Sequence, residues 1–308
     1  MLHNIIRVGT RALDFFRARV PICLIIACSV IAFGIGLKWN QADDMVLAAI
    51  DCGQGDALLL RTPHGRSVLF DTGGTRNGNE PGAFNIGKRV ILPYLRHYGV
   101  RELDAIFLTH AHADHAGGAG PVLRNMPVGI VYTADEGREA YAESMGLVNT
   151  DILLQKLHPA QEGMVFELDG VRIEVVFAPS LTLKGQESGN EASNVYRIVY
   201  GNASFLVTGD LTKENEKRIL EKGSNIRCTV LKVGHHGSDT SSSEEFLQAV
   251  NPRYAVICVG AGNGFGHPKA EVLERLEKLG ARIFRTDQNG EIKFCTDGKT
   301  MRVETYIE

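Results

Sequence analysis

The chain has 308 residues, of which 44% are hydrophobic and 22% charged, a balance typical of a globular protein with a sizeable core. Its formal net charge of -3 excludes a protein that binds nucleic acid through bulk positive charge, although it leaves room for a local basic surface. The 6 cysteines lie mostly in apolar runs without the spacing of a zinc knuckle or redox motif. We therefore interpret them as buried hydrophobic residues.

The first 44 residues indicate attachment to a membrane. An uncharged apolar run covers residues 20–37, which is near the minimum length that crosses a bilayer as a helix. Positively charged flanks stay in the cytoplasm, and four arginines precede this run. We therefore predict a basic cytoplasmic segment at 1–19, a single transmembrane anchor at 20–37 and a short linker at 38–44. The remainder would lie outside a bacterial cytoplasmic membrane. Two alternatives stay open, a cleaved signal peptide ending near Ala42 and a lipoprotein signal at Cys28.

Residues 45–308 are predicted to form one domain, because they contain no repeat, low-complexity tract or linker. Short apolar or β-branched runs predict strands in two series. The first series covers residues 46–50, 57–61, 67–70 and 105–109, and the second covers 171–177, 195–200, 204–208, 229–233, 254–259, 282–285 and 291–295. Helical patterns lie at 86–98, 212–221 and 269–279. This order favours an α/β fold with two packed sheets, each covered by helices, a four-layer αββα sandwich.

A cluster of metal-capable side chains follows the predicted strand at 105–109. His110, His112, Asp114 and His115 lie within a few residues of one another, separated by alanines and followed by Gly117 and Gly118. Imidazoles two residues apart at a strand end can hold one ion, and a carboxylate with a third imidazole beyond them can hold a second. The small residues let the backbone pass close to the ions. The segment therefore predicts a centre for one or two divalent metal ions.

This HxHxDH pattern with its glycines resembles the metallo-β-lactamase superfamily, and more closely the C-terminal hydrolase domain of ComEC-type DNA-internalisation competence proteins. Further matching stretches follow in family order at residues 51–57, 70–74, 90–95, 208–210, 231–238 and 266–268. The resemblance implies an αββα metallo-β-lactamase sandwich with metals at one edge, which agrees with the strand pattern.

The resemblance also implies the metal ligands. His110 and His112 would bind a first ion, Asp114 and His115 a second, and Asp210 would bridge the two ions. An alternative role for Asp210 is to cap the helix predicted from residue 212, since aspartate is a good N-cap.

One histidine of the pair that follows residue 234 should complete the second ion's ligands. We expect His235 in this role and His236 in contact with substrate or with neighbouring groups. The family usually supplies one more histidine to the first ion, but the interval between residues 115 and 210 contains only His158, in an unsuitable loop. Asn190 to Ser193 occupies that place instead. The site would therefore hold either one or two ions. The metal would be either zinc or manganese, since a site with more oxygen ligands tolerates manganese better.

Four further residues are expected around the metals. Gln54 and Asp56 in a Gly-rich turn, and Asp71 at a strand end, would orient the metal ligands. His267 in a Gly-rich loop would bind a phosphate or protonate a leaving group. The alternative for His267 is a loop histidine bonded to the backbone.

Two charged stretches have no motif. A basic excess between residues 57 and 101 would suit a polyanion or form a solvated face; its members are Arg61, Arg66, Arg76, Lys88, Arg89, Arg96 and Arg101. The acidic stretch Asp135, Glu136, Glu139 and Glu143 indicates a solvent-facing helix without a chemical role.

The predicted reaction is hydrolysis by a metal-activated hydroxide, with Asp114, Asp210 and His267 as its catalytic residues. The absence of a nucleophile elbow and of a phosphate loop from the sequence argues against covalent acyl transfer and kinase chemistry. We predict a phosphodiesterase or nuclease that acts on DNA outside the cytoplasmic membrane. Full competence proteins of this type also carry a DNA-conducting bundle of membrane spans, so a role in DNA uptake would need a separate channel protein.

Two alternative functions stay open. One is a hydrolase of another ester or amide, such as a phosphorylcholine ester, a lactam or a lactone, because the fold does not fix the substrate. The other is a membrane-anchored metal-binding protein without catalytic activity. The oligomeric state is not predicted.

Overall fold

The computed structural model describes residues 44–179 and 189–307. The predicted cytoplasmic segment, the anchor at 20–37 and the linker up to residue 43 lie outside the described residues. Within the two described ranges, no helix combines the length and the apolar character that crossing a membrane requires. The anchor therefore stays a prediction.

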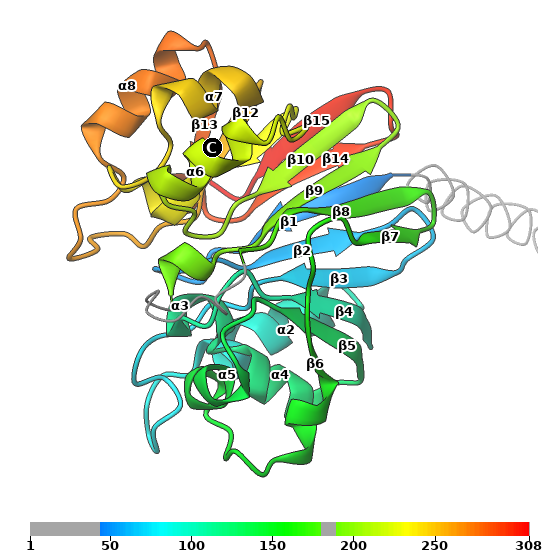
Figure 1. The fold of residues 1–308 in the computed structure, drawn as a ribbon. Helices are drawn as coiled ribbons and strands as arrows, with labels where there is room; N and C mark the ends of the chain where they lie inside the picture. The colour runs from blue at the N-terminus through cyan, green and yellow to red at the C-terminus, as the bar shows by residue number, and fades with distance from the viewer. Residues whose placement is uncertain (1–43, 180–188, 308) are drawn as a thin grey trace, which may run out of the picture. The chain divides into compact units, whose positions relative to one another are not determined.

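Two mixed sheets form the centre of the fold (Figure 1). The first has the order β15-β14-β1-β2-β3-β4-β5-β6 and is parallel from β3 to β6. Its strands are β1 (Met45–Ala49), β2 (Leu58–Arg61), β3 (Ser67–Phe70), β4 (Leu103–Phe107), β5 (Val128–Thr133), β6 (Leu157–Pro159), β14 (Ile292–Thr296) and β15 (Met301–Thr305).

The second sheet has the order β13-β12-β11-β10-β9-β8-β7 and is parallel from β10 to β13. Its strands are β7 (Val165–Leu168), β8 (Val171–Phe177), β9 (Val195–Tyr200), β10 (Ala203–Val207), β11 (Val230–Lys232), β12 (Tyr254–Ile257) and β13 (Arg282–Arg285). The strands of both predicted series are therefore confirmed, with ends shifted by at most two residues. The strand predicted at 291–295 belongs to the first sheet, as β14, although it comes late in the chain.

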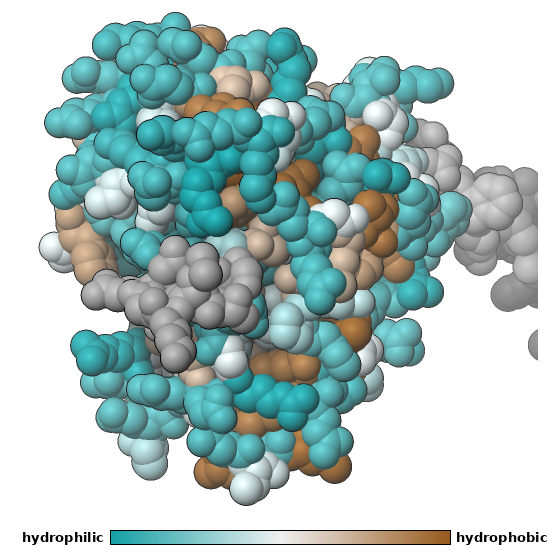
Figure 2. All heavy atoms as spheres, in the orientation of Figure 1, coloured by the Kyte–Doolittle hydropathy of each residue, from teal (hydrophilic) through white to brown (hydrophobic). Residues whose placement is uncertain are grey.

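Helices cover the outer face of each sheet. In Figure 1, α2 (Leu92–His97), α4 (Ala119–Asn125) and α5 (Arg138–Met145) lie on the first sheet. On the second lie α6 (Lys213–Glu221), α7 (Glu244–Val250) and α8 (Ala270–Lys278), whose outward surfaces are mostly hydrophilic in Figure 2. The helix predicted at 86–98 is present as a π-helical turn, η1 (Gly87–Ile91), that continues into α2. Shorter helical segments are α3 (Ala113–Ala116), η2 (Ile152–Lys156), η3 (Asn190–Ala192), η4 (Gly234–Gly237) and α9 (Thr286–Asn289).

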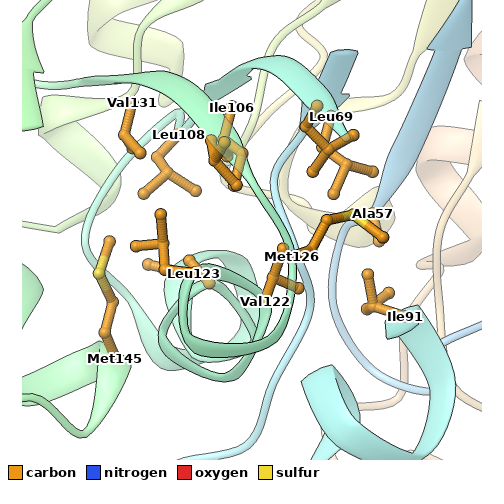
Figure 3. Packing of buried hydrophobic residues seen from close by; sticks show 14 of the residues in the cluster. Ala57, Leu69, Ile91, Ile106, Leu108, Val122, Leu123, Met126, Val131 and Met145 are labelled. Atoms are coloured by element: carbon orange, nitrogen blue, oxygen red, sulfur yellow. The ribbon is translucent and has the colours of Figure 1, made fainter. Parts of the chain in front are cut away.

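Three apolar layers separate the four structural layers, because successive side chains of a strand point to opposite faces of its sheet. Leu69 of β3 packs toward Val122 and Leu123 of α4 (Figure 3), whereas its neighbour Phe70 enters the layer between the sheets. There Phe70 stacks on Phe107 with ring centroids 5.2 Å apart. The predicted αββα sandwich is thus confirmed.

A third cluster lies between the second sheet and its helices. In it Leu206 of β10 and Leu231 of β11 share a core with Ile219 of α6 and Phe246 of α7. Since both sheets contain a parallel half, the loops after β3, β4 and β5 and those after β10, β11 and β12 follow carboxyl ends of parallel strands. Such ends are where α/β sheets place their binding sites.

Candidate metal centre

The predicted site residues lie in these strand-end loops. Asp71 directly follows β3, and the HxHxDH segment (residues 110–115) follows β4. Asp210 follows β10, the pair His235 and His236 follows β11, and His267 lies in the long loop after β12. Residues from five loops, spread over some 200 positions of sequence, thus come together at one edge of the two sheets.

Two glycines let neighbouring loops press against the HxHxDH segment. Gly55 has a φ of +139° and Gly74 a φ of +147°, in the range that L-residues avoid. A Cβ atom at Gly55 would clash with the carbonyl oxygen of Asp114, and one at Gly74 with that of Ala113. The contacts are backbone to backbone, as in the hydrogen bond from Asp56 N to Asp114 O at 3.1 Å. No side chain fits at either glycine without moving the metal-binding segment.

Asp114, His115, Asp210 and His236, here named the four-ligand group, offer one ligand atom each within 4.8 Å of one another. His115 Nε2 lies 3.1 Å from Asp210 Oδ1, and His236 Nε2 lies 3.3 Å from Asp114 Oδ2. Both Nε2 atoms and Asp210 Oδ1 are buried, with no hydrogen-bond partner among the described residues. Because buried polar atoms are nearly always bonded, converging lone pairs of this kind fit a divalent cation.

His110, His112 and Asp210 form a second set, here named the three-ligand group, under the same distance limit. His110 is buried and its Nε2 also lacks a hydrogen-bond partner, whereas His112 is exposed. Asp210 belongs to both groups. A carboxylate shared in this way can bridge two ions.

The buried imidazoles are held through their second nitrogen. His115 Nδ1 lies 2.8 Å from Asp71 Oδ2, and His236 Nδ1 lies 2.8 Å from the carbonyl oxygen of Cys258. His110 Nδ1 lies 3.2 Å from Thr109 Oγ1. An acceptor at Nδ1 keeps the ring proton there and leaves the lone pair of Nε2 free for a metal ion.

Asp71 and Asp56 support this arrangement in different ways. Asp71 accepts hydrogen bonds from Thr109 N and Thr109 Oγ1, both at 2.8 Å, and thereby fixes the start of the metal-binding segment. Asp56 lies 3.3 Å from His236 Nδ1 and forms an ion pair with Lys232 of β11. Lys232 is only 1% exposed and also donates to Gly209 O at 2.9 Å, next to Asp210.

Lys232 was not anticipated from the sequence. The available signal was a charged residue at the end of an apolar strand, two positions before the glycine that precedes the histidine pair, because a lysine is rarely buried unless it is paired.

The carboxylates set the protonation of the site. Burial by itself lowers the pKa of His115, but Asp210 and Asp71 outweigh it and raise this pKa well above the ordinary value. In the same way Asp210 and Asp114 overcome burial and raise the pKa of His236 to about 9. Burial, followed by the neighbouring His115, lowers the pKa of His110 well below its usual range. The electrostatic potential at the four-ligand group is thus negative and favours a bound cation, as expected at a metal site.

His236 rather than His235 belongs to the four-ligand group, contrary to the expected order of the pair. Both residues have positive φ angles, +48° and +52°, which turn the two rings apart. His236 points inward onto Cys258 O, whereas His235 Nδ1 contacts Thr240 Oγ1 at 2.9 Å. The Nε2 atom of His235 remains 3.6 Å from Asp210 Oδ2, at the rim of the site.

The place of the usual extra histidine is taken by the segment around Ser193. Its Oγ accepts a hydrogen bond from Asp210 N at 3.2 Å and lies 3.5 Å from His110 Nδ1. Asn190 Nδ2 lies 3.3 Å from His235 Nε2. His158 is exposed on β6 and belongs to neither ligand group.

The alternative role of Asp210 as a helix cap is not what the structure contains. Thr212 caps α6, and its side chain accepts a hydrogen bond from Asn215 N. This leaves Asp210 free to face the imidazoles.

Gln54 and His267 shape the opposite side of the site. Gln54 Oε1 accepts a hydrogen bond from Gly260 N at 3.0 Å. Gln54 therefore positions the loop after β12 and, contrary to the prediction from the sequence, does not orient a metal ligand. The ring of His267 lies 5.8 Å from that of His235, and its buried Nδ1 has no hydrogen-bond partner among the described residues. Its ring is therefore not bonded to the backbone through Nδ1. Burial, with His235 as the next cause, lowers the pKa of His267.

Glu136 has a structural role that the sequence interpretation missed. It precedes α5 and is partly buried rather than fully exposed, and its carboxylate accepts hydrogen bonds from Ala111 N at 2.6 Å and Gly189 N at 2.7 Å. Burial raises its pKa. Glu136 thereby ties the HxHxDH segment to the chain that leads to Ser193. Glu139 and Glu143 are exposed, as expected for the solvent face of a helix.

A cavity of about 620 Å³ opens at the metal centre, next to one member of each ligand group. His112, Asp114 and Glu136 line it together with Arg76 and Phe265. The volume accommodates a substrate fragment of a few tens of atoms, in the usual range for ligand sites.

Comparison with known proteins places this geometry in a family. The sequence profile described as "Metallo-beta-lactamase superfamily" matches residues 50–261, which include both ligand groups. The chain belongs to the metallo-beta-lactamase superfamily. A solved member of this fold, YhfI from Bacillus subtilis, is 13% identical and has a TM-score of 0.52 over 78% of this chain and 96% of its own. At that identity the likeness shows the fold alone.

The resemblance to ComEC-type competence proteins is confirmed by the curated relatives. ComE operon protein 3 of Bacillus subtilis is 36% identical over 80% of this chain, and Competence protein ComA of Neisseria gonorrhoeae is 37% identical over 79%. These matches cover 32% and 31% of the two relatives. The chain thus spans about a third of the length of the curated relatives that it matches.

Proposed function

We propose that this chain is a metal-dependent phosphodiesterase that cleaves DNA. The observation that carries the proposal is Asp210, which belongs to both ligand groups and whose buried Oδ1 has no hydrogen-bond partner among the described residues. Two ions bridged by one carboxylate are the usual device for stabilising the attacking and leaving oxygens of a phosphate ester.

Divalent ions at these ligands would lower the pKa of a bound water toward about 7 and neutralise negative charge on the substrate. The chain's own residues supply orientation. Asp71 and the Cys258 carbonyl fix the rings of His115 and His236, and Thr109 fixes that of His110. Fixed ligands need no reorganisation when charge develops, which is the main electrostatic contribution of an active site.

His267 is proposed to contact the substrate phosphate. Its lowered pKa makes the ring neutral near pH 7, and a neutral imidazole donates one N–H to a phosphate oxygen. Protonation of a leaving oxygen by His267 would require the negative charge of the substrate to raise this pKa again.

One basic side chain at the centre, Arg76, supports an anionic substrate. Arg61 donates to Tyr98 O and Arg66 forms an ion pair with Asp104 at 2.6 Å, so these two stabilise the domain itself. Arg76 lines the cavity at the centre. Lys88, Arg89, Arg96 and Arg101 are exposed as well. Of the basic excess expected from the sequence, only Arg76 lines the cavity at the centre, where its charge suits a phosphate.

The resemblance to competence proteins supports DNA as the substrate. Since the chain spans about a third of its relatives, their role in DNA uptake is not transferred with the fold. We propose that any such role here requires a separate channel protein. The membrane anchor at 20–37, with residues 45–308 outside the cytoplasm, is part of the same proposal. Carbonate extraction of the full chain, with protease added to intact spheroplasts, tests it: a chain released by carbonate or protected from protease would contradict it.

The test of the activity combines metal content with cleavage. The full chain is loaded with Mn²⁺ or Zn²⁺ and incubated with end-labelled single-stranded DNA. We expect cleavage by the loaded protein, loss of cleavage with a chelator, and loss in Asp210→Asn. His158→Ala, which changes an exposed histidine outside both ligand groups, serves as the control and should cleave normally. Absence of cleavage with either metal would overturn the proposal.

The alternatives give different results in the same assay. A loaded protein that hydrolyses a phosphorylcholine ester, a lactone or a lactam but not DNA is a hydrolase of another class. Bound metal without activity on any of these substrates would indicate the non-catalytic metal-binding protein.

A further inference from the structure

The loop between β12 and α8 places an aromatic ring in the cavity at the metal centre. Phe265 is 66% exposed, although it is one of the larger apolar side chains of the protein. Isolated exposed hydrophobic residues are ordinary on protein surfaces. Phe265 differs because it lines the same cavity as His112 and Asp114, so the exposed ring faces the place where substrate would bind.

The loop that carries this ring is held by a dense set of hydrogen bonds. The side-chain amide of Asn263 donates to Gly260 O at 3.0 Å and to His267 O at 2.7 Å, and its Oδ1 accepts from His267 N at 3.1 Å. Lys269 Nζ donates to Phe265 O at 2.9 Å. The backbone on both sides of Phe265 is therefore fixed without any burial of its ring.

Two contacts position the Phe265 ring next to the metal centre. The rings of Phe265 and His267 are nearly parallel, with an interplanar angle of 6° and centroids 5.8 Å apart. Gln54 holds the base of the same loop through Gly260 N. A preformed aromatic face thus stands beside the histidine that we propose to contact the phosphate.

The lining of the cavity narrows the class of group that this face would bind. Arg76 supplies a positive charge for a phosphate, and Phe265 is the one phenyl, phenol or indole ring among the described lining residues. A quaternary ammonium group is recognised by a cage of several aromatic faces, which the described lining of this cavity does not provide. One flat ring next to an arginine matches a nucleotide, with a base for the ring and a phosphate for the charge.

We infer that Phe265 stacks on an unpaired nucleobase next to the scissile phosphate and makes the site selective for single-stranded DNA. The inference rests on the proposed phosphodiesterase function and adds its specificity. In a duplex each base is already stacked on its neighbours, so a fixed ring reaches a base face only if that base is extruded. Stacking of this kind tolerates any base, so little sequence preference is expected.

The test uses the full chain loaded with the metal that supports cleavage. Substrates are single-stranded oligonucleotides, intact or with one tetrahydrofuran abasic residue placed at successive positions near the cut. Phe265→Ala should raise KM for the intact strand by about 10-fold, with the larger effect on KM than on kcat, since one stacking contact contributes about that factor. Phe265→Trp should restore the wild-type KM. Phe84→Ala removes a ring that is 62% exposed outside this cavity and should change nothing.

The abasic series separates stacking from a structural effect. For the wild type, an abasic residue at one position should raise KM as much as Phe265→Ala raises it for the intact strand. For Phe265→Ala, an abasic residue at that position should raise KM no further. Equal KM values for wild type and Phe265→Ala, or two losses that multiply, would overturn the inference while the proposed function stands.

A binding measurement covers the case in which the proposed function fails. Metal-free protein in chelator is titrated into a 2-aminopurine oligonucleotide, whose fluorescence falls on stacking. Quenching by the wild type and by Phe84→Ala, but not by Phe265→Ala, supports the stacking contact even if no DNA is cut. Absence of quenching by the wild type overturns the inference that Phe265 stacks on a nucleobase. A KM for a phosphorylcholine ester that rises in Phe265→Ala would overturn it as well.

Discussion

The two ligand groups share Asp210 but differ in how their other members are held. In the four-ligand group, His115 and His236 are buried and each has an acceptor 2.8 Å from its Nδ1 atom. In the three-ligand group, His112 is exposed and the usual additional histidine is replaced by the segment around Ser193. The difference teaches that one metal centre can combine a preorganised half with a looser half, because rotamers fixed in advance cost no entropy when an ion binds.

The largest effect is expected from Asp210→Asn, because this residue joins the groups. The asparagine keeps the shape but replaces one carboxylate oxygen by an NH2 group that cannot bind a cation, and it removes the negative charge. Since loss of a supporting residue around a metal costs about 10- to 100-fold, loss of this ligand should weaken metal binding and cleavage by more than about 100-fold. Elemental analysis and DNA cleavage measure both, with His158→Ala as the control. Two bound ions and activity within tenfold of wild type would show that the groups are not joined.

The next effect separates the paired histidines. His236→Ala removes a member of the four-ligand group and should reduce metal affinity by about 100-fold or more. His235→Ala removes a ring at the rim, 3.6 Å from Asp210, and should reduce it by less than about tenfold. Binding isotherms of the two variants measure the contrast. The reverse ranking would restore the ligand order that the sequence predicts.

Asp71→Asn tests the difference between the two ligand groups without replacing a metal ligand. Asp71 orients His115 and fixes Thr109, so the substitution should weaken binding at the four-ligand group by about 10- to 100-fold. The three-ligand group should be affected less, although Thr109 also contacts His110. Competition with a chromophoric chelator resolves the two affinities, and equal losses at both would contradict a selective role.

The smallest effect is expected from Glu136→Gln. The substitution weakens two hydrogen bonds from backbone N–H groups, at Ala111 and Gly189, by removing the charge of the acceptor. The loss should be about 1 kcal/mol of the free energy of unfolding, since Glu136 is only partly buried. Urea denaturation of the metal-free protein measures it. Glu139→Gln, at an exposed position of α5, is the matched control and should leave the free energy of unfolding unchanged.

Much of the fold could be predicted because its strands are buried on both faces. Leu69, Phe70, Leu206 and Phe205 belong to short apolar runs, and their length and the turn residues around them favour strands over helices. The strands that the sequence did not reveal are β5, inside the first sheet, and β6, β7 and β15, at sheet edges. In β7 and β15 exposed and half-buried residues alternate, so no continuous apolar run marks them.

The metal ligands could be predicted where they are close in sequence, but not where the local backbone conformation determines which side chain faces the metal site. His110 to His115 form one motif, and Asp71 and Asp56 were recognised as supporting groups. The order of His235 and His236 could not be deduced, because it depends on two positive φ angles and on a carbonyl 22 residues away. Lys232 and Glu136 were missed since an isolated charge in sequence does not disclose its burial or its partners.

The central claim is that the two groups bind ions with unequal affinity and share Asp210. Titration of the metal-free full chain with Mn²⁺ or Zn²⁺, for wild type, His112→Ala and His236→Ala, tests it directly. We expect two ions in the wild type, one tight and one weak. His112→Ala should lose only the weak ion, and His236→Ala should lose the tight affinity. Loss of the tight ion in His112→Ala, or two unchanged ions in His236→Ala, would contradict the account.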